Sequence, residues 1–448
     1  MAVDKKKYDI IVLGATGFTG SFIFKELVNI LSDVNKISHW DSLKEKHLKI
    51  AIAGRNSVKL NDLVKNTLNE YPSFNDGVDC LVVDVTDLEQ LMQVTEQAKV
   101  VLSAVGPYKI YGPKVLEACI NTESHYVDIT GEVGFIENSY CEFNNEAKRK
   151  DLALVHCCGF DSTPADLGTL LLKKYLVGKG LEPQSIDMFV EFIVKSYSGS
   201  GNFTTFECAM LAMTQRNPYR KKFKELLPRA PAPPNNLSRS KLPAFEPRIN
   251  GYVIPFPMAD GPVVNMTQNI IHKEKQSENC DLESSITSLP ASNIGSYFKF
   301  KNLFHTIAAV FMAIICGIIL KLPFGPSLIL RYPHFFTLGV FKPLDMSKPS
   351  LEGIKNDSFN VTFIAKCKKA GSDSVSEVKA KFSGPEPGYN FTSKAAAVAA
   401  LTILKEKVYD GTLKVKGVLT PGLALFNTNF TDRINAHEPT VKFEIYEN

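Results

Sequence analysis

The sequence lacks the patterns that would commit it to metal, acyl-transfer or phosphoryl chemistry. Its nine cysteines include no C-x-x-C pair, its eight histidines form no H-E-x-x-H motif, and no G-x-S-x-G elbow occurs. A phosphate-binding loop of the ATPase type ends in Lys-Ser or Lys-Thr, and the glycine-rich loop near the N-terminus continues with Ser-Phe instead. We therefore expect no metal site and no nucleotide hydrolysis.

A large excess of one charge is also absent. The net charge is +4 over 448 residues, with 22% charged and 44% hydrophobic residues, so the composition is globular and gives no case for a nucleic-acid partner. Residues 1–7 are polar and contain no signal-peptide core. Together with the odd number of cysteines, this predicts a reducing, cytosol-facing location and free thiols.

What the sequence does contain is a strand, a glycine turn and a helix in direct succession near its start. Ile10–Leu13 is an unbroken apolar run, typical of a central parallel strand, and an apolar helical pattern follows Gly20. The glycines between them are spaced G-x-x-G-x-x-G, which lets the backbone approach a pyrophosphate and directs helix N–H groups toward it. We therefore predict dinucleotide binding here, with an ordinary glycine-rich turn as the alternative. The residues concerned are Gly14, Thr16, Gly17, Phe18, Thr19 and Gly20.

The ends of the next strands predict how the rest of a dinucleotide binds. The second strand, expected over residues 48–53, is followed by Gly-Arg-Asn, and an arginine there accommodates the 2′-phosphate of NADP, whereas a carboxylate would select NAD. We therefore predict NADP as the cofactor and Arg55 as its phosphate ligand, with a solvated surface arginine as the alternative. Asp84 is a candidate adenine contact after the third strand. Ala104 and Gly106 are small and leave room for the nicotinamide.

Five further residues are candidates for chemistry because they follow the fourth, fifth and sixth strands. Tyr108 would lie near the reacting carbon as a proton donor or a stacking ring, although Gly-Pro-Tyr is also an ordinary turn. Asp128 and Glu132 lie at the crevice where such sheets bind ligands, with capping as the alternative role. We assign Tyr108 and Asp128 as catalytic candidates, and Glu132, Cys158 and Asp161 as substrate-binding candidates.

Five ordered motifs resemble the saccharopine dehydrogenase-like oxidoreductases: Gly-Ala-Thr-Gly-Phe-Thr-Gly, Ala-Gly-Arg, Gly-Pro-Tyr, Tyr-Val-Asp-Ile-Thr-Gly-Glu and Gly-Phe-Asp-Ser-Thr-Pro-Ala-Asp. The resemblance is clear over residues 1–220 and returns at residues 417–421. It implies an N-terminal Rossmann domain, a mostly antiparallel second domain, lipid-droplet and membrane association in animal members, and bacterial relatives that are trans-acting enoyl reductases of glycolipid synthesis. True saccharopine-forming enzymes bind a dicarboxylic amino acid, and no basic cluster suited to several carboxylates is evident, which argues against saccharopine as the substrate.

The length allows two domains. We predict an α/β chain with an NADP-binding Rossmann domain over residues 1–180, whose βα units form a doubly wound parallel sheet. Residues 181–390 are expected to form an α+β substrate or dimerisation domain, and residues 391–448 a helix and strand that return to the core. Within these segments we expect strands at residues 186–194, 359–366, 375–382 and 440–446, helices at 203–213 and 394–408, and irregular linkers at 228–247 and 276–296.

The composition changes abruptly at residues 303–341. Phe304–Leu320 is an apolar run just short of the roughly 20 residues that a bilayer span requires. Proline and glycine break it, and a second apolar, more aromatic run follows. This predicts a hairpin that enters one leaflet of a membrane or the monolayer of a lipid droplet; a buried core helix and a dimer interface are the alternatives. The basic residues that would reach the headgroups are Lys301, Lys321, Arg331 and Lys342.

Two functions from different classes fit these patterns. The first is an NADP-dependent oxidoreductase that acts on a lipid-like carbonyl or enoyl substrate at a lipid droplet or a cytosol-facing membrane, with the hydride supplied by the cofactor. The second is a lipid-droplet surface protein that keeps the nucleotide-binding fold as a scaffold and has lost catalysis. A homodimer is compatible with either. NADPH would bind in both cases, but only the enzyme would oxidise it with a lipid substrate.

Overall fold

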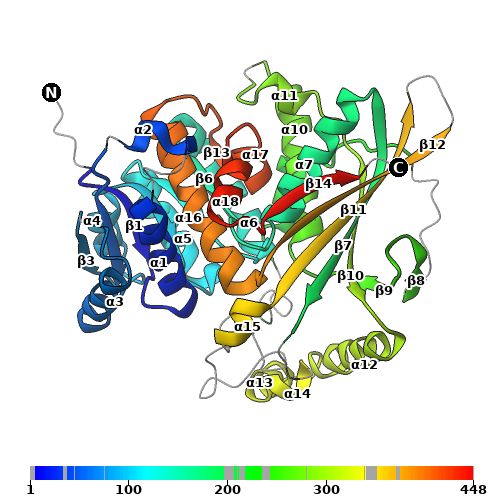
Figure 1. Ribbon diagram of the computed structural model, residues 1–448, viewed down its shortest axis with the longest axis horizontal. Coiled ribbons are helices and arrows are strands. Elements are labelled where there is room, and N and C mark those ends of the chain that lie inside the picture. The colour runs from blue at the N-terminus through cyan, green and yellow to red at the C-terminus, as the bar shows by residue number, and fades with distance from the viewer. Residues whose placement is uncertain are drawn as a thin grey trace.

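Two seven-stranded sheets lie side by side and share one hydrophobic core in the computed structural model (Figure 1). The structure describes residues 6–33, 38–44, 46–74, 76–195, 206–208, 210, 217–234, 243–278, 280–337, 339, 351–369 and 374–446.

The first sheet is parallel throughout and has the order β3-β2-β1-β4-β5-β6-β13. Its first six strands follow the Rossmann order, because the chain starts in the middle of the sheet, runs to one edge and then crosses to the other. Every residue of β1 is buried, which explains its unbroken apolar sequence. The strands are β1 (Tyr8–Leu13), β2 (Ile50–Gly54), β3 (Val78–Val82), β4 (Ala98–Ser103), β5 (His125–Asp128), β6 (Ala153–Val155) and β13 (Gly417–Leu419).

Helices form two layers against this sheet, as the prediction of a doubly wound fold requires. α1 (Phe18–Asp33) contacts α3 (Ser57–Glu70) and the alanine-rich α16 (Thr392–Thr402) in one layer. α16 continues as a π-helical segment, η6 (Ile403–Tyr409), and packs on β4 and β5, so the predicted return of this helix to the Rossmann sheet is confirmed. The other layer consists of α4 (Leu88–Thr95), α5 (Tyr108–Asn121) and α6 (Val133–Arg149).

The second sheet is mixed, with the order β14-β12-β11-β7-β10-β9-β8. Only the β7–β10 pair is parallel among the strands that the structure describes there. The predicted antiparallel pair at residues 359–366 and 375–382 is confirmed, with Val361 opposite Phe382. The strands are β7 (Leu181–Ile193), β8 (Ala244–Glu246), β9 (Gly251–Pro255), β10 (Asn293–Phe300), β11 (Ser358–Lys369), β12 (Val375–Pro385) and β14 (Lys442–Tyr446).

The junction of the two sheets is filled by α7 (Thr163–Gly178), which packs on β7 and β11 and also contacts α10 (Asp260–Lys275). The segment after residue 390 supplies β13 to the first sheet and β14 to the second, so it joins both. The predicted domain boundaries remain a proposal. The shorter helices are η2 (Ser38–Trp40), α2 (Asp41–Lys44), α9 (Arg220–Leu226), η3 (Pro247–Ile249), α11 (Ser284–Thr287), α15 (Leu351–Asn356), η5 (Pro387–Phe391), α17 (Pro421–Leu425) and α18 (Phe430–His437).

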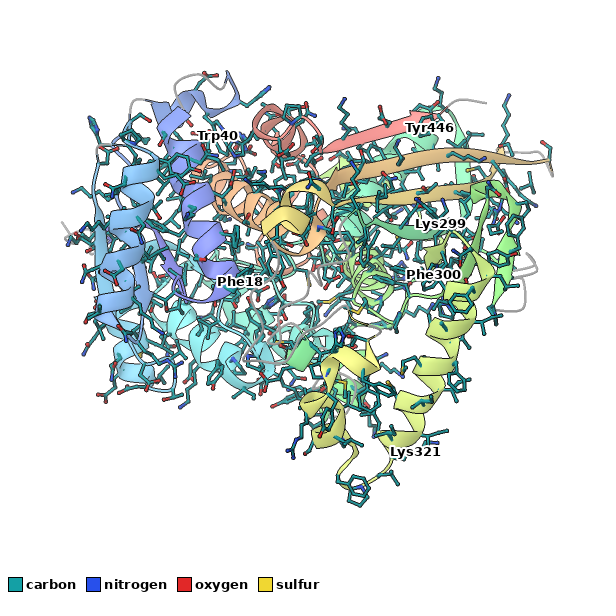
Figure 2. The ribbon with its side chains drawn as sticks, turned by 60° about the horizontal axis from the view of Figure 1, so that its bottom comes forward. Phe18, Trp40, Lys299, Phe300, Lys321 and Tyr446 are labelled. Carbon is teal, nitrogen blue, oxygen red and sulfur yellow. The ribbon has the colours of Figure 1, made fainter. Side chains whose placement is uncertain are left out.

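In its described residues, the apolar insertion forms three helices that project from the rest of the chain at the bottom of Figure 1. These are α12 (Leu303–Ile319), α13 (Gly325–Arg331) and α14 (Pro333–Phe336). In Figure 2, Lys321 lies at the far tip of this projection. Among the described residues, no helix combines the length and the apolar character needed to cross a bilayer. Lys342, one of the predicted headgroup contacts, lies outside the described residues.

Two expectations about the elements differ from the structure. The polar residues 276–296 are not a linker, because they contain α11 and the start of β10. Residues 228–247 include β8, although they are otherwise irregular where the structure describes them. α6 and α10 were not anticipated at all. The helix expected at residues 203–213 can be assessed only at residues 206–208 and 210, which are helical; its other residues lie outside the described part of the chain.

Candidate functional site

A cavity of about 630 Å³ opens where the strands of the first sheet end. The turns after β1, β2, β4 and β5 all contribute to its wall, because parallel strands present their carboxyl ends at the same edge. Met258, from the segment before α10, and the helical residues Glu207 and Cys208 close it from the side of the second sheet. The cavity therefore lies at the junction of the two sheets, where an α/β fold binds its ligands.

The glycine loop lines this cavity with a backbone that only glycine permits. Gly14 has φ +82°, a left-handed conformation that other residues rarely adopt, and a Cβ there would lie 2.7 Å from Val105 Cγ2. A Cβ on Gly20 would lie 2.2 Å from the Gly14 carbonyl oxygen. α1 begins at Phe18, inside the motif, so its first N–H groups face the cavity. The bare backbone and the helix start fit a pyrophosphate.

The six loop residues predicted to bind the cofactor all line the cavity. They are Gly14, Thr16, Gly17, Phe18, Thr19 and Gly20. Phe18 is also fixed from the other side, since its ring meets the ring of Tyr389 edge-on at 4.8 Å.

Two cations and one carboxylate lie at the cavity end beside β2 and β3. Arg55 and the neighbouring Lys59 are exposed, and neither forms an ion pair with a described residue. Asp84 accepts hydrogen bonds from the backbone and hydroxyl of Thr86 at 2.9 and 2.8 Å, and these bonds lower the pKa of its carboxyl group. The end of the cavity that would receive an adenosine therefore carries two cations free to bind a phosphate group.

Small residues open the cavity after β4, as predicted. Ala104 and Gly106 line it, and the thiol of Cys208 lies 3.3 Å from the position that a Cβ on Gly106 would take. Tyr108 also lines the cavity, but its hydroxyl donates a hydrogen bond to the Ser103 carbonyl at 3.0 Å. Burial raises the pKa of this phenol well above its usual value. Tyr108 therefore lines the cavity, but its hydroxyl proton is directed at the Ser103 carbonyl oxygen and not at the cavity.

Glu132 is a buried carboxylate that binds the start of a helix. Its two oxygens accept hydrogen bonds from the backbone N–H groups of Tyr108 and Lys109 at 2.8 and 2.9 Å. Burial raises the pKa of Glu132, while these two amides oppose the shift. The structure thus shows Glu132 in the alternative role of a helix cap. The helix that it caps is α5, although Glu132 itself immediately precedes α6. Glu132 remains part of the cavity wall.

Asp161 reaches the same cavity from the segment before α7. Its Oδ2 would lie 3.0 Å from a Cβ on Gly131, so the two chain segments are in direct contact. Burial raises the pKa of Asp161 to about 6. The nearby Asp260, at the start of α10, is only 1% exposed, and burial and the charge of Asp161 raise its pKa well above the usual value. Asp161 is therefore a cavity carboxyl group that takes up its proton below about pH 6, at a higher pH than an ordinary aspartate.

Two predicted site residues do not line the cavity. Asp128 is fully buried and accepts four hydrogen bonds, from the Tyr126 hydroxyl, from His156 Nδ1 at 2.7 Å, and from the backbone of Thr130 and Cys157. Its catalytic assignment is corrected: it fixes the turns after β5 and β6, because all its acceptor sites point into the protein. 

Cys158 is also fully buried, with its thiol near the carbonyl oxygens of Val155 and His156, and burial raises its pKa well above the usual value. Its predicted contact with substrate is corrected for the same reason: the chain turns sharply between Cys158 and Ser162, so the side chain points into the core and Asp161 points into the cavity.

Five charged, aromatic or sulfur-containing residues of the cavity wall were not predicted from the sequence. Lys59 carried a usable signal, because it is a second cation only four residues after Arg55, in the first turn of α3. Tyr111 lies likewise one turn after the predicted Tyr108. No local pattern indicates the other three, since they approach from distant parts of the chain; they are Glu207, Cys208 and Met258.

Comparison with known proteins agrees with this geometry. Residues 10–155 match the family model "Saccharopine dehydrogenase NADP binding domain", which confirms NADP as the cofactor. A probable mitochondrial saccharopine dehydrogenase-like oxidoreductase of Arabidopsis thaliana is 28% identical, with 98% of this chain and 96% of the relative covered. A "Lipid droplet localized protein" of Caenorhabditis elegans is 27% identical, with 98% of each chain covered.

A solved structure shares the fold over the same length. Saccharopine dehydrogenase (L-Glu forming) from Saccharomyces cerevisiae superposes with a TM-score of 0.55 at 14% identity, covering 98% of this chain and 100% of the yeast chain. The similarity extends through both sheets, so it includes the fold of the second sheet as well as the NADP-binding domain. Over nearly its whole length the chain is similar to saccharopine dehydrogenase-like oxidoreductases, and its residues 10–155 match the NADP-binding domain of saccharopine dehydrogenases.

Proposed function

We propose that this protein reduces a carbonyl group or an activated double bond of an uncharged, lipid-like substrate with NADPH, and that it does so at a lipid surface. The main observation that supports this proposal is the distribution of charged residues along the cavity. Arg55 and Lys59 lie at the adenosine end, whereas Glu132, Asp161 and Glu207 lie at the other end. Among the described lining residues, no lysine or arginine accompanies these acids. A substrate with several carboxylates would be repelled there, which disfavours saccharopine.

The residues present would hold NADPH as follows. The main-chain amides of the loop from Gly14 to Gly20 would bind the pyrophosphate, Arg55 and Lys59 the 2′-phosphate, and the small residues Ala104 and Gly106 would leave room for the nicotinamide. When bound, NADPH supplies a hydride. The part left to the protein is to orient the substrate and to deliver a proton.

Asp161 is the proposed proton donor. Its carboxyl group reaches the cavity and is protonated below about pH 6, so it can transfer a proton to the oxygen or carbon that becomes anionic as hydride arrives. Glu132 is less suited, because two backbone N–H groups hold its oxygens and favour the charged form. The hydroxyl of Tyr108 donates to Ser103 instead. Water would then reprotonate Asp161 through the open cavity.

The lipid surface is proposed from one face of α12. Five large apolar side chains follow each other at intervals of three and four residues, and each is more than half exposed. They are Phe304, Ile307, Phe311, Ile314 and Ile318. Exposed side chains of the neighbouring segments widen this apolar face: Leu322, Phe324, Tyr332 and Phe335. Soluble proteins rarely leave such a contiguous apolar patch without a partner.

Charge favours a lipid monolayer over a second copy of the chain as that partner. Residues 301–341 contain no Asp or Glu, while Lys301, Lys321 and Arg331 flank the apolar residues and suit anionic headgroups. A helix that pairs with itself carries charged residues beside its apolar seam, and α12 carries none. α12 is also shorter than a bilayer span. Insertion into a single leaflet fits all three observations.

Turnover of NADPH with lipids tests this function. Purified full-length protein is incubated with NADPH and a lipid extract, and the loss of absorbance of the reduced nicotinamide is followed with mass spectrometry of the lipids. We expect NADPH oxidation together with a lipid that gains two hydrogens. Binding of NADPH without oxidation by any carbonyl or enoyl lipid fraction would instead support the scaffold function.

A further inference from the structure

A small apolar cluster lies apart from the main core, on the inner side of the insertion. Its buried members are Phe206, Met210, Ile329 and Phe336. Partly buried side chains of α12 pack against them on the face opposite the exposed one: Met312, Ile315, Cys316 and Ile319. The projecting helices are thus held to a short stretch whose described residues, 206–208 and 210, are helical and belong to a different part of the chain.

That short stretch has two faces with different surroundings. Phe206 and Met210 are 7% and 5% exposed and belong to the apolar cluster. Two of the residues between them, Glu207 and Cys208, line the cofactor and substrate cavity. Cys208 lies against Gly106, and burial together with the charge of Glu132 raises the pKa of its thiol. One helical turn therefore connects the lipid-facing helices with the wall of the cavity.

We propose that binding of a lipid surface to α12 is transmitted through this apolar cluster to the cavity wall at Glu207 and Cys208. The inference rests on the proposed function, because it requires α12 to bind lipid. The cluster has few buried residues and is separate from the main core, so its packing is a low-stability part of the fold. Lipid that covers the outer face of α12 stabilises the packed arrangement and increases its population.

The coupling has a stated direction. In the packed arrangement Phe206 and Met210 hold the helical turn in place, so Cys208 stays against Gly106 and the cavity keeps its shape for the nicotinamide half of NADPH. Lipid should therefore protect Cys208 from solvent and strengthen NADPH binding. By linkage, NADPH should strengthen lipid binding by the same factor.

Cysteine labelling tests the inference without a substrate. The full-length protein is treated with N-ethylmaleimide, with and without phosphatidylcholine vesicles containing phosphatidylserine, and the labelling of each cysteine is followed by peptide mass spectrometry. We expect vesicles to slow the labelling of Cys208 on the order of fivefold or more. Cys280 is exposed and lies beyond α10, so its labelling rate should stay constant. The dissociation constant for NADPH, read from its fluorescence, should fall by a similar factor.

Two variants and a control assign the effect. Met210→Ala should still bind vesicles, but its Cys208 labelling should no longer respond to them. The double variant Phe311→Ser, Ile314→Ser should lose both vesicle binding and the response. Val375→Ser, which alters an exposed apolar residue at the start of β12, should behave as the wild type.

The failures are distinguishable. Vesicle binding with unchanged Cys208 labelling would overturn the coupling and leave the proposed lipid surface intact. Absence of vesicle binding would overturn the proposed surface and the coupling together. Slower labelling of both Cys208 and Cys280, or a full response in Met210→Ala, would show that the effect does not pass through the apolar cluster.

Discussion

Three carboxyl groups near the ends of β5 and β6 differ in their roles because their surroundings differ. Glu132 is held by two amides, Asp128 is enclosed by four donors, and Asp161 reaches the open cavity. Burial raises the pKa of Asp161 to about 6, and no amide is directed at it to oppose that shift among the described contacts. Such separation of carboxyl groups by environment is how one site provides both an anchor and an acid.

The proposed donor gives turnover a defined pH dependence. Asp161 is protonated below its pKa of about 6, so the rate of lipid reduction should fall by about tenfold per pH unit above that value. Asp161→Asn should lower kcat by about 10² to 10⁴ and abolish this pH dependence, while the dissociation constant for NADPH stays unchanged. Steady-state kinetics across the pH range provide the check. A normal pH profile in Asp161→Asn would exclude this residue as the donor.

A second residue-scale prediction concerns stability. Lys173 is 1% exposed, and its ammonium group donates to Gln268 Oε1 at 2.5 Å. Burial lowers its pKa to about 7, against 10.5 in the unfolded chain. Between these values the unfolded state binds more protons, so this lysine destabilises the fold most below pH 7, and the cost declines as pH rises toward 10.5.

Lys173→Met should therefore raise the melting temperature at about pH 6, and the gain should shrink by about pH 9. Thermal unfolding at the two pH values measures it. The exposed neighbour Lys174 offers a matched control, since Lys174→Met should change stability by less than about 0.5 kcal/mol at either pH. A gain in Lys173→Met that is equal at both pH values would contradict a lowered pKa.

The sequence predicted site residues most accurately where the position of the backbone alone brings a residue to the cavity. The glycine loop, Arg55, Asp84, Ala104 and Gly106 all line the cavity, because their position after a parallel strand already places them at one edge of the sheet. Side-chain direction after a strand is a different matter, as Asp128 and Cys158 show. Their partners come from other segments, and no local pattern in the sequence contains those contacts.

At the scale of elements, α12 departs from the usual rule that the apolar face of a helix is turned inward. Both of its faces are apolar: one packs in the small cluster, and the other carries the exposed side chains from Phe304 to Ile318. The packing of the inner face holds the helix in place and leaves the outer face available. That arrangement is expected for a helix that rests on a lipid surface.

Flotation with lipid tests this element. The full-length protein should float with vesicles that contain phosphatidylserine, and the double variant Phe311→Ser, Ile314→Ser should stay in the protein fraction, because it removes two exposed apolar side chains from the centre of the face. Its thermal stability should be close to that of the wild type, since neither side chain is buried. If the double variant floats equally well, the lipid-binding element lies elsewhere. A switch from dimer to monomer in this variant would instead assign the face to a second copy of the chain.

The elements that the sequence revealed are those with uninterrupted patterns. The first six strands of the parallel sheet and the antiparallel β11–β12 pair were predicted, whereas the three-residue strand β13 was not. α6 was not predicted, although its buried residues Phe135, Ile136, Tyr140 and Ala147 recur at helical spacing. β10 was hidden, because it starts with Asn-Ile-Gly-Ser, whose polar residues resemble a linker, and only its later residues are aromatic.

For the whole molecule, the decisive feature is the junction of the two sheets. The parallel sheet supplies the loop, the two cations and the small residues of the cavity, whereas Glu207, Cys208 and Met258 close it from the other side. β13 and β14 tie the end of the chain into both sheets, and α7 packs between them. The sequence predicts the part of the cavity that the parallel strands form. It does not predict the residues that close the other side, because they are far from those strands along the chain.

The central claim is that this cavity binds NADPH through the glycine loop and the cations beside it. Titration of the intact protein with NADPH and with NADH, followed by nicotinamide fluorescence, tests it most directly. We predict at least about tenfold tighter binding of NADPH, and a loss of about 10- to 100-fold for NADPH alone in Arg55→Ala, because a hydrogen bond to a charged phosphate is worth about 1.5–3 kcal/mol. No association with either nucleotide, or equal affinity for both, would contradict the account.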